Sequence, residues 1–553
     1  MKILRPVPPS VTRPVAAAVV LAWVVTMGVV VNRSYLQASA NLAADLARYG
    51  SDAQWQGVYY RGEKIGFSVR QTTPAGRGFE LHEDGRLQMS LLGATTSMRI
   101  RTTARVDGEF RLESFNFSLD PGTGPLEVKG RLDGLRLTLE IVTASGSRTE
   151  TRELTERPLL AVGIGRRLAS SGLTPGATYQ WMVFDPATLQ NAPLLARVGA
   201  RELVASGLRR GSVPAFAVTM EFGGIQTTSW ITDTGETVRE ESPMGLITIR
   251  ESAESARMMA VADRGRTDLL EAAAVVPRTK LRIPETRDVR RIRLGLKGAD
   301  FSGFELDGLN QTFAAGMLEV RDPRRLQAGP ADPDAARHLA AEPMIESDDE
   351  AIVAAAALAV QGVEGTRARA ERLVRHVNDL LEKKPTISLP SAREVLRTKV
   401  GDCNEHTALY VAMARSLGIP ARIATGLAYT RGAFYYHAWP EVYIDEGRGR
   451  GLWLPVDPTF NQFPADATHI RFARGGLEKQ AAILPLIGKL EISIFDLELA
   501  PEAADQVLVG RKSADNTPLS IAMPQRSASG GCWDTAPSAR PERPGRREAP
   551  ERR

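Results

Sequence analysis

The sequence predicts a multidomain protein of the α+β class, and three observations lead to this class. The chain has 553 residues, more than one hydrophobic core usually organises, so about two to four domains are expected. Short segments rich in β-formers fill most of the first half, whereas capped helices followed by strands fill the second half. Strands and helices that are segregated along a chain are typical of α+β folds.

The composition is that of a globular protein and excludes some function classes. Hydrophobic residues make up 43% of the chain and charged residues 24%, which is enough apolar material for packed cores. The net charge of +5 is small for this length, and no basic face carries interleaved aromatic residues, so we expect no nucleic-acid partner. Two cysteines cannot form a disulfide framework, so a reduced Cys403 is compatible with any compartment.

Residues 1–34 are expected to form an N-terminal membrane anchor. An uncharged apolar run extends from Val15 to Val31, which is short for a membrane-spanning helix of about 20 residues. More basic residues precede the run than follow it, which favours a single pass through the inner (cytoplasmic) membrane with the bulk of the protein exported. A signal peptide cleaved at Ala38-Ser39-Ala40 and a buried soluble helix are the alternatives.

Residues 45–260 are predicted to form an antiparallel β-rich domain with short helices. Segments such as Lys64–Val69 and Phe115–Leu119 gather β-formers between Gly, Asp and Pro turns, and a helical stretch from Leu159 to Ser171 interrupts them. Because no His, Cys or carboxylate residues cluster here at ligand spacing, we expect a scaffold or a binding surface whose ligand the sequence does not specify.

Two smaller segments follow from composition and pattern. Residues 285–322 are predicted to be a small β unit with strands at Arg291–Leu296 and Met317–Val320, set between basic, Pro-containing linkers. Residues 511–553 are rich in Ser, Pro, Gly, Arg and Glu and are expected to be disordered.

Residues 335–500 form the remaining predicted domain, which begins with helices and continues with strands. Ser347–Glu350 and Ser391–Glu394 are capping-box patterns that open helices, and Thr366 is a candidate cap for another. A helix that begins near Cys403 is expected to end at Leu417, because Gly418 and Pro420 follow. Strands are then expected at Ala421–Tyr429, Phe434–Ile444 and Gly451–Val456.

The position of Cys403 favours a reactive thiol. With Asp402 as the N-cap, the sulfur meets the unpaired N–H groups and the positive dipole end of the helix, which lower the pKa of a thiol. A nearby histidine can accept the proton, and the same N–H groups can hold the oxyanion of a tetrahedral intermediate.

The strand periodicity brings a histidine and an aspartate together. His437 and Trp439 share one face of their strand, and Asp457 follows the next, antiparallel strand, so Asp457 can lie beside His437 and orient its imidazole. Pro440 interrupts the first of these strands, which predicts an edge strand or a bulge there.

Four motifs in this order resemble the transglutaminase-like superfamily, whose domain has a papain-like fold. They are Gly401-Asp-Cys-Asn-Glu-His406, Ala414-Arg-Ser-Leu-Gly-Ile-Pro-Ala-Arg422, His437-Ala-Trp-Pro-Glu-Val-Tyr443 and Trp453-Leu-Pro-Val-Asp-Pro-Thr459. Trp439 and the segment Asp466-Ala-Thr-His469 also look like its bacterial, membrane-associated branch. The resemblance covers about Ser347 to Arg474 and implies catalytic roles for Cys403 as nucleophile, His437 as general base and acid, and Asp457 as orienting carboxylate.

Each of these residues also has a simpler interpretation. A lone cysteine is usually an inert small hydrophobe, and Asp457 before Pro458 can merely start a turn. Trp439 can line the substrate site or be a packed aromatic, and His469 is expected to be structural. His406 follows Cys403 by nearly one helical turn, but no second Cys/His pair at metal spacing exists, so we expect no metal and no cofactor.

The sequence therefore predicts a membrane-anchored, thiol-dependent amide-bond enzyme, a cysteine protease or acyltransferase with a protein or peptide substrate. The alternative is a non-catalytic envelope protein that uses the same fold to bind peptides or polymers, and a protein that only tethers a partner is third. The substrate, the choice between hydrolysis and acyl transfer, and the oligomeric state stay open.

Overall fold

A computed structural model describes residues 53–501, except for 92–93, 122–124, 144, 209–210, 243–244, 259–267, 269–270, 272, 385–390, 477–478, 480–482 and 484–485. The chain divides into two compact units, one formed by residues 1–89 and 95–267 and the other by residues 90–94 and 268–553. The expected anchor at residues 1–34 and the expected tail at residues 511–553 lie outside the described residues. Of the helices that the structure does describe, none is long and apolar enough to span a membrane.

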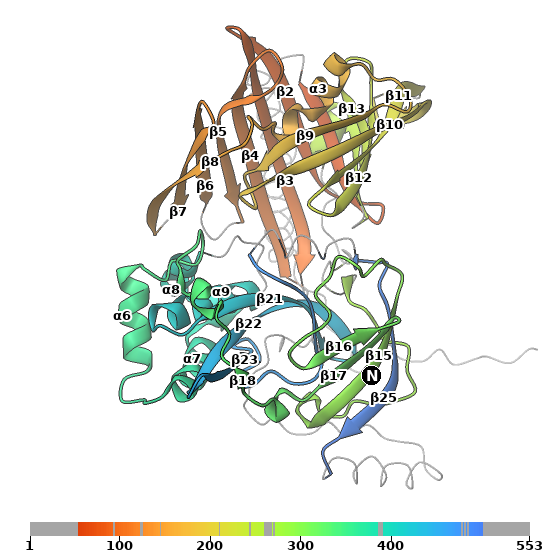
Figure 1. The fold of residues 1–553 in the computed structure, drawn as a ribbon. Coiled ribbons are helices and arrows are strands. Elements are labelled where there is room, and N and C mark those ends of the chain that lie inside the picture. Colours follow the sequence, from red (N-terminus) through yellow and green to blue (C-terminus); the bar gives the residue numbers. More distant parts are fainter. Residues whose placement is uncertain are drawn as a thin grey trace, which may run out of the picture. The chain divides into compact units, whose positions relative to one another are not determined.

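The first unit contains one antiparallel sheet of 14 strands, drawn in Figure 1 as a strongly curved wall. The strands are β1 (Gln54–Tyr60), β2 (Glu63–Ala75), β3 (Gly78–Leu91), β4 (Ala94–Val106), β5 (Leu112–Asp120), β6 (Leu126–Asp133), β7 (Arg136–Thr143), β8 (Gly146–Glu153), β9 (Thr178–Asp185), β10 (Gln190–Ser206), β11 (Gly211–Phe222), β12 (Ile225–Ile231), β13 (Thr237–Glu241) and β14 (Leu246–Glu251). The predicted antiparallel β-rich region is thus confirmed.

The order of the strands explains how this sheet is built. From β1 the chain runs strand by strand out to β8 at one edge, crosses to β9 at the other edge, and returns through β10–β13 to β14, which pairs with β1. The crossing segment contains the short helix η2 (Ala161–Gly163) and α3 (Ile164–Ser171), in the stretch where the sequence predicted a helix. The sheet folds back on itself, because the rings of Phe115 on β5 and Phe184 on β9 are 5.4 Å apart. A further short helix, α4 (Ala253–Arg257), follows β14.

Alternation along the strands gives this sheet a buried and an exposed face. On β7 the side chains of Leu137, Leu139 and Ile141 are buried, whereas those of Arg136 before them and Thr138 between them are exposed. This period of two is the pattern that the sequence carries, and it fixes which face of the sheet encloses the interior.

The second unit has three layers, with helices on one side of a five-stranded sheet and a four-stranded sheet on the other (Figure 1). The helices are α6 (Glu350–Ala359), α7 (Thr366–Leu380), α8 (Ala392–Thr398) and α9 (Cys403–Ser416). The central sheet has the order β18 (Gly329–Pro330), β23 (Arg450–Pro455), β22 (Ala433–Gly447), β21 (Ala421–Thr430) and β24 (His469–Arg474). The other sheet has the order β16 (Gln311–Ala314), β17 (Met317–Arg321), β15 (Val289–Lys297) and β25 (Glu491–Leu499). Short helices η3 (Thr286–Asp288), η4 (Pro323–Arg325) and η5 (Ala335–Leu339) lie in the connections.

Helix α9 lies at the centre of the first of two apolar cores in this unit. Its side chains Leu409 and Met413 are fully buried in a cluster that also contains Val442 and Leu454 of the central sheet. The second core joins the other side of that sheet to β15, β17 and β25. The strands expected at Arg291 and Met317 are therefore present as β15 and β17, and they share a core with the central sheet.

The helices begin near the predicted caps, with two shifts. Thr366 does not cap α7 but is its first residue, and Gly365 is the N-cap. Ser391 caps α8 by accepting a hydrogen bond from Glu394 N, as expected. At α6 the cap is Asp349, which accepts from Ala351 N and Ile352 N, so the helix begins at Glu350.

The expectation for Pro440 is wrong. Strand β22 is an inner strand between β21 and β23, and its register with β21 is continuous from Ala433 to Val442. Proline has no backbone N–H to donate to a neighbouring strand. Pro440 is tolerated because the pairing of β22 with β23 begins one residue later, at Glu441. No carbonyl of β23 in that pairing therefore lacks a donor. The carbonyl of Pro440 instead accepts a hydrogen bond from Val456 N at 2.9 Å.

Candidate active site

Helix α9 places Cys403 at its first position, and a capping box fixes this start. Asn404 N donates to Asp402 Oδ1 at 3.0 Å, and Asp402 N donates to Glu405 Oε2 at 2.8 Å. Since the cap residue and its partner are both buried, the end of the helix cannot shift without breaking these bonds. The Cys403 side chain is partly exposed at this end.

A buried hydrogen bond attaches the first turn of α9 to strand β22. Thr407 Oγ1 donates to the carbonyl of Ala438 at 3.1 Å, and Ala438 is the residue next to His437. The cysteine end of the helix and the histidine of the strand are therefore held to each other through the backbone. Burial lowers the pKa of the neighbouring His406, and its hydrogen bond to Asp402 and the charge of Asp457 only partly offset this effect.

His437 and Asp457 meet directly, as the strand periodicity predicted. The distance between His437 Nε2 and Asp457 Oδ2 is 2.8 Å, and both side chains are buried. The other oxygen of Asp457 accepts hydrogen bonds from Thr459 N at 2.7 Å and Phe460 N at 3.0 Å. The turn after β23 thus presents the carboxylate to the imidazole in a fixed orientation.

A second histidine shares the same carboxylate. His469 Nε2 lies 3.0 Å from Asp457 Oδ2, and its Nδ1 lies 3.2 Å from Asp466 Oδ1. Asp466 is held in turn by Gln462 Nε2 at 2.9 Å and by Thr468 Oγ1 at 2.6 Å. Two imidazoles and two carboxylates therefore form one buried chain of hydrogen bonds.

The charges in this chain stabilise one another. Burial alone would raise the pKa of Asp457, but the charge and hydrogen bond of His437, followed by those of His469, hold this pKa well below its usual range. Burial alone would lower the pKa of His469, but its bonds to Asp457 and Asp466 raise it to about 9. At neutral pH, His469 is therefore an imidazolium between two carboxylates.

Two aromatic rings stack on the imidazole of His437 and restrict its orientation. The ring of Phe460 is stacked on it at 4.8 Å between centroids, and the ring of Trp439 is stacked at 6.0 Å. The edge of Trp439 also meets His469 at 5.1 Å, and the Trp439 side chain is 1% exposed. Trp439 thus packs behind both histidines, and its substrate-binding role stays a prediction.

Two observations concern whether the histidines of this site could bind a metal ion. His406 Nδ1 lies 2.6 Å from the carbonyl of Asp402, which can only accept, so this nitrogen carries the proton. The ligand atoms of His437, Asp457 and His469 lie within 4.8 Å of one another, a spacing that a metal ion can bridge. However, the hydrogen bonds described above already use these atoms, which favours a proton-bearing network over a metal site.

A cavity of about 890 Å³ lies next to this network. It is lined by Phe460 and His469, by Asn378 of α7 and by the turn between β21 and β22. Asn378 Nδ2 donates to the carbonyls of Pro458 at 2.7 Å and Thr459 at 3.1 Å, which ties α7 to the turn that carries Asp457. The cavity is large enough for a peptide side chain and its neighbouring backbone.

A comparison with protein families agrees with the motifs. Residues 354–458 match the model of the transglutaminase-like superfamily. The chain contains a transglutaminase-like domain. The matched segment of this domain includes Cys403, His437 and Asp457, and it ends before Asp466 and His469.

Similarities to solved structures are weak. A β-barrel-like protein from Brucella abortus, of a domain of unknown function, is 12% identical over 36% of this chain and 96% of its own, with a TM-score of 0.28. A proposed cysteine protease from Cytophaga hutchinsonii is 17% identical over 38% of this chain and 86% of its own, with a TM-score of 0.25. No curated protein matches the chain.

The sequence missed the partnership of His469 with Asp457. In the sequence, the segment from Asp466 to His469 stands out only by its resemblance, and a structural role is expected for His469. Their spacing of three residues was the available signal, since a His and an Asp so close in sequence can pair locally. The contact of His469 with Asp457 depends on how β24 and the turn after β23 meet in space.

Proposed function

We propose that the transglutaminase-like domain is a thiol-dependent amide-bond enzyme with Cys403, His437 and Asp457 as its catalytic residues. The observation that carries this proposal is the buried 2.8 Å contact between His437 Nε2 and Asp457 Oδ2 beside the capped start of α9. Because Nε2 is bound to the carboxylate, Nδ1 of His437 is the nitrogen that takes the thiol proton. The stacked Phe460 and Trp439 rings keep it in that orientation.

The reaction begins when the Cys403 thiolate attacks an amide carbonyl. The oxyanion that forms is stabilised by backbone N–H groups at the start of α9, and His437 donates its proton to the leaving amine as the C–N bond breaks. The thioester that remains is attacked by water or by a second amine, with His437 accepting the proton of the attacking group. The products are a carboxylic acid in the first case and a new amide in the second.

The open cavity beside Phe460 and His469 supports a protein or peptide substrate. Its lining includes charges of both signs, from Arg282, Arg431 and Asp379, so it can hydrogen-bond to a peptide backbone and to polar side chains. We propose hydrolysis of peptide or isopeptide bonds as the general outcome, with acyl transfer where an amine binds in place of water.

The test is covalent trapping with a peptide-based, thiol-reactive amide mimic. The full chain should be labelled once, at Cys403, and Cys403→Ala should abolish the labelling. Cys532→Ala is the matched control, because it removes the other cysteine and should leave labelling unchanged. His437→Ala should slow labelling strongly, with circular dichroism confirming that the variant is folded and with His82→Ala as its control. Labelling that persists in Cys403→Ala would contradict the proposal and favour a peptide-binding protein.

We also propose that residues 1–34 anchor the protein in the inner membrane with both units exported. The apolar run from Val15 to Val31 and its basic flank support this location. Fractionation of cells that express the full chain or a variant without residues 1–34 tests it. The full chain should remain with the membranes after a high-salt wash, and recovery of the full chain in the soluble fraction would refute the anchor.

A further inference from the structure

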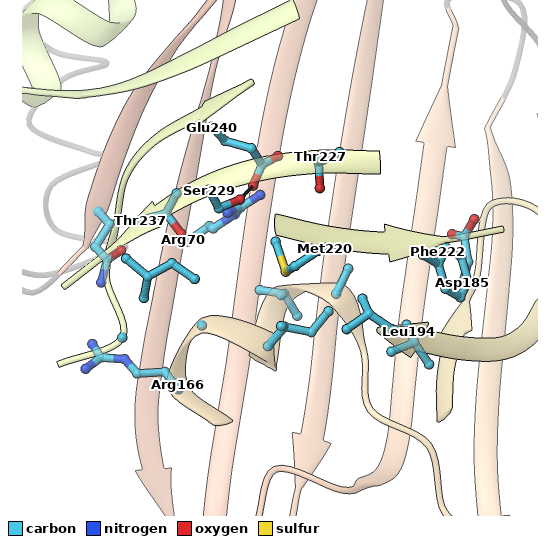
Figure 2. A pocket seen from close by; sticks show the side chains of 18 of the residues that line it. Arg70, Arg166, Asp185, Leu194, Met220, Phe222, Thr227, Ser229, Thr237 and Glu240 are labelled. Atoms are coloured by element: carbon cyan, nitrogen blue, oxygen red, sulfur yellow. Dashed lines mark hydrogen bonds between the residues drawn. The ribbon is translucent and has the colours of Figure 1, made fainter. Parts of the chain in front are cut away.

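A cavity of about 350 Å³ lies within the β-rich unit (Figure 2). Residues of β1, β2, β9–β13 and the η2–α3 segment line it. Interiors of folded proteins contain few voids larger than a water molecule, and small-molecule sites have volumes of about 300–1,000 Å³. The size of this cavity is therefore that of a ligand site.

One wall of the cavity is apolar. Alternation along β11 and β12 turns apolar side chains inward, and β9 and β10 complete the wall with Val183, Leu194, Met220, Phe222, Ile225 and Ile231. An apolar chain placed against these side chains leaves water and gains dispersion contacts, so the wall favours an aliphatic group.

The opposite end of the cavity carries more negative than positive charge. Figure 2 shows Arg70, Ser229 and Glu240 close together there. Arg70 Nε pairs with Glu83 Oε1 at 2.6 Å and is also attracted by Glu240, while Ser229 Oγ donates to Glu240 Oε2 at 2.9 Å. The single positive charge of Arg70 thus interacts with two carboxylates, those of Glu83 and Glu240. Among the residues that the structure describes, no cation lies within ion-pair distance of Glu240, so this end has a negative excess.

The other two charged side chains that line the cavity do not change this balance. Arg166 Nη1 donates to the carbonyl of Thr234 at 2.6 Å. Asp185 accepts from Ala187 N at 3.0 Å and from Thr188 Oγ1 at 2.6 Å. Arg166 and Asp185 have opposite charges, and each is hydrogen-bonded to neighbouring residues of the protein. Glu240 is therefore the group that would select the polar head group of a ligand.

We propose that this cavity binds a single-chain aliphatic amine. The chain lies against the wall formed by Leu194, Met220 and Phe222, and the ammonium group donates hydrogen bonds to Glu240. The ammonium supplies the positive charge that the Arg70 end lacks, whereas a carboxylate head would add a third negative charge beside Glu83 and Glu240. This site does not depend on Cys403 and extends the function of the protein beyond amide chemistry.

Isothermal titration of the full chain with dodecylamine, dodecanol and dodecanoate tests the proposal at concentrations below micelle formation. Dodecylamine should bind at least about tenfold more tightly than dodecanoate, as expected for one charge-assisted hydrogen bond. Glu240→Gln should reduce the affinity for dodecylamine to that for dodecanol. Glu241→Gln, the next residue on β13, should leave both affinities unchanged.

Filling the cavity gives an independent test. Thr227 lines the cavity and Thr228 does not, because neighbouring residues on β12 point to opposite faces. Thr227→Phe should abolish binding, and Thr228→Phe should retain it, with circular dichroism confirming that both variants are folded. Absence of dodecylamine binding to the wild-type chain, tighter binding of dodecanoate, or equal effects of the two phenylalanine variants would each overturn the proposal.

Discussion

The charged state of His469 predicts a specific pH dependence of stability for the transglutaminase-like domain. The perturbation is His469→Gln, which keeps a hydrogen-bond donor but removes the positive charge. Asp457 and Asp466 are the titratable groups in contact with the His469 ring, and the His437 ring lies near it with centroids 5.7 Å apart. The wild-type imidazolium stabilises both carboxylates, and glutamine cannot replace that charge.

The magnitude follows from the raised pKa of His469. One pKa unit corresponds to about 1.4 kcal/mol, so a pKa raised from 6.5 to about 9 corresponds to roughly 3 kcal/mol. Because the pKa is raised in the folded state, this contribution is fully present below pH 6.5 and is lost as the pH rises through about 9. The two carboxylates have lowered pKa values, so their contributions are lost only at acidic pH and do not overlap with this range.

The assay is urea unfolding from pH 6 to pH 10, with the unfolded fraction read by pulse-labelling hydrogen exchange in peptides from α9. The difference in unfolding free energy between wild type and His469→Gln should be largest at pH 6 and should shrink by roughly 3 kcal/mol by pH 10. His376→Gln is a matched control from α7 and should show no such trend. A difference that is constant across the pH range would refute the charged state assigned to His469.

Three further predictions concern the supports of the candidate site. Asp457→Asn should slow trapping of Cys403 by about 10³–10⁴-fold, because an amide does not hold the His437 imidazole in the required tautomer, and the measurement is the second-order rate with the amide mimic. Thr407→Val should lower the unfolding free energy by about 1 kcal/mol through loss of its hydrogen bond to Ala438, and it should also slow trapping of Cys403. An unchanged trapping rate would show that this hydrogen bond does not position the helix. Glu441→Gln should destabilise the domain by about 3–5 kcal/mol in urea unfolding, because the three arginines that contact this buried carboxylate would lose their charged partner. A loss of unfolding free energy below about 1 kcal/mol would contradict that reasoning.

Local signals in the sequence were sufficient for the starts of α8 and α9 and for the contact between His437 and Asp457. The caps at Asp402 and Ser391 act within three or four residues, so the sequence alone predicts them well. The period of two along β22 and the short turn after it likewise placed His437 beside Asp457, because register in a hairpin is fixed by neighbouring residues.

Contacts between residues far apart in the chain could not be predicted as well from the sequence. Pro440 suggested an edge strand, because a sequence cannot show where the ladder with a neighbouring strand begins. The sheet formed by β15–β17 needs β25, which follows it by more than 150 residues, so the sequence suggested a separate small unit.

Local patterns of the sequence predict the β-rich region, the capped helix that starts at Cys403, and the approach of His437 on β22 to Asp457 after β23. Only the tertiary structure decided that His469 shares the carboxylate of Asp457 and that Arg70, Ser229 and Glu240 face one cavity. The physical reason is the range of the interactions. Caps and strand alternation act between neighbours in the chain, whereas shared carboxylates and cavities are formed by side chains from elements that meet only when the chain folds.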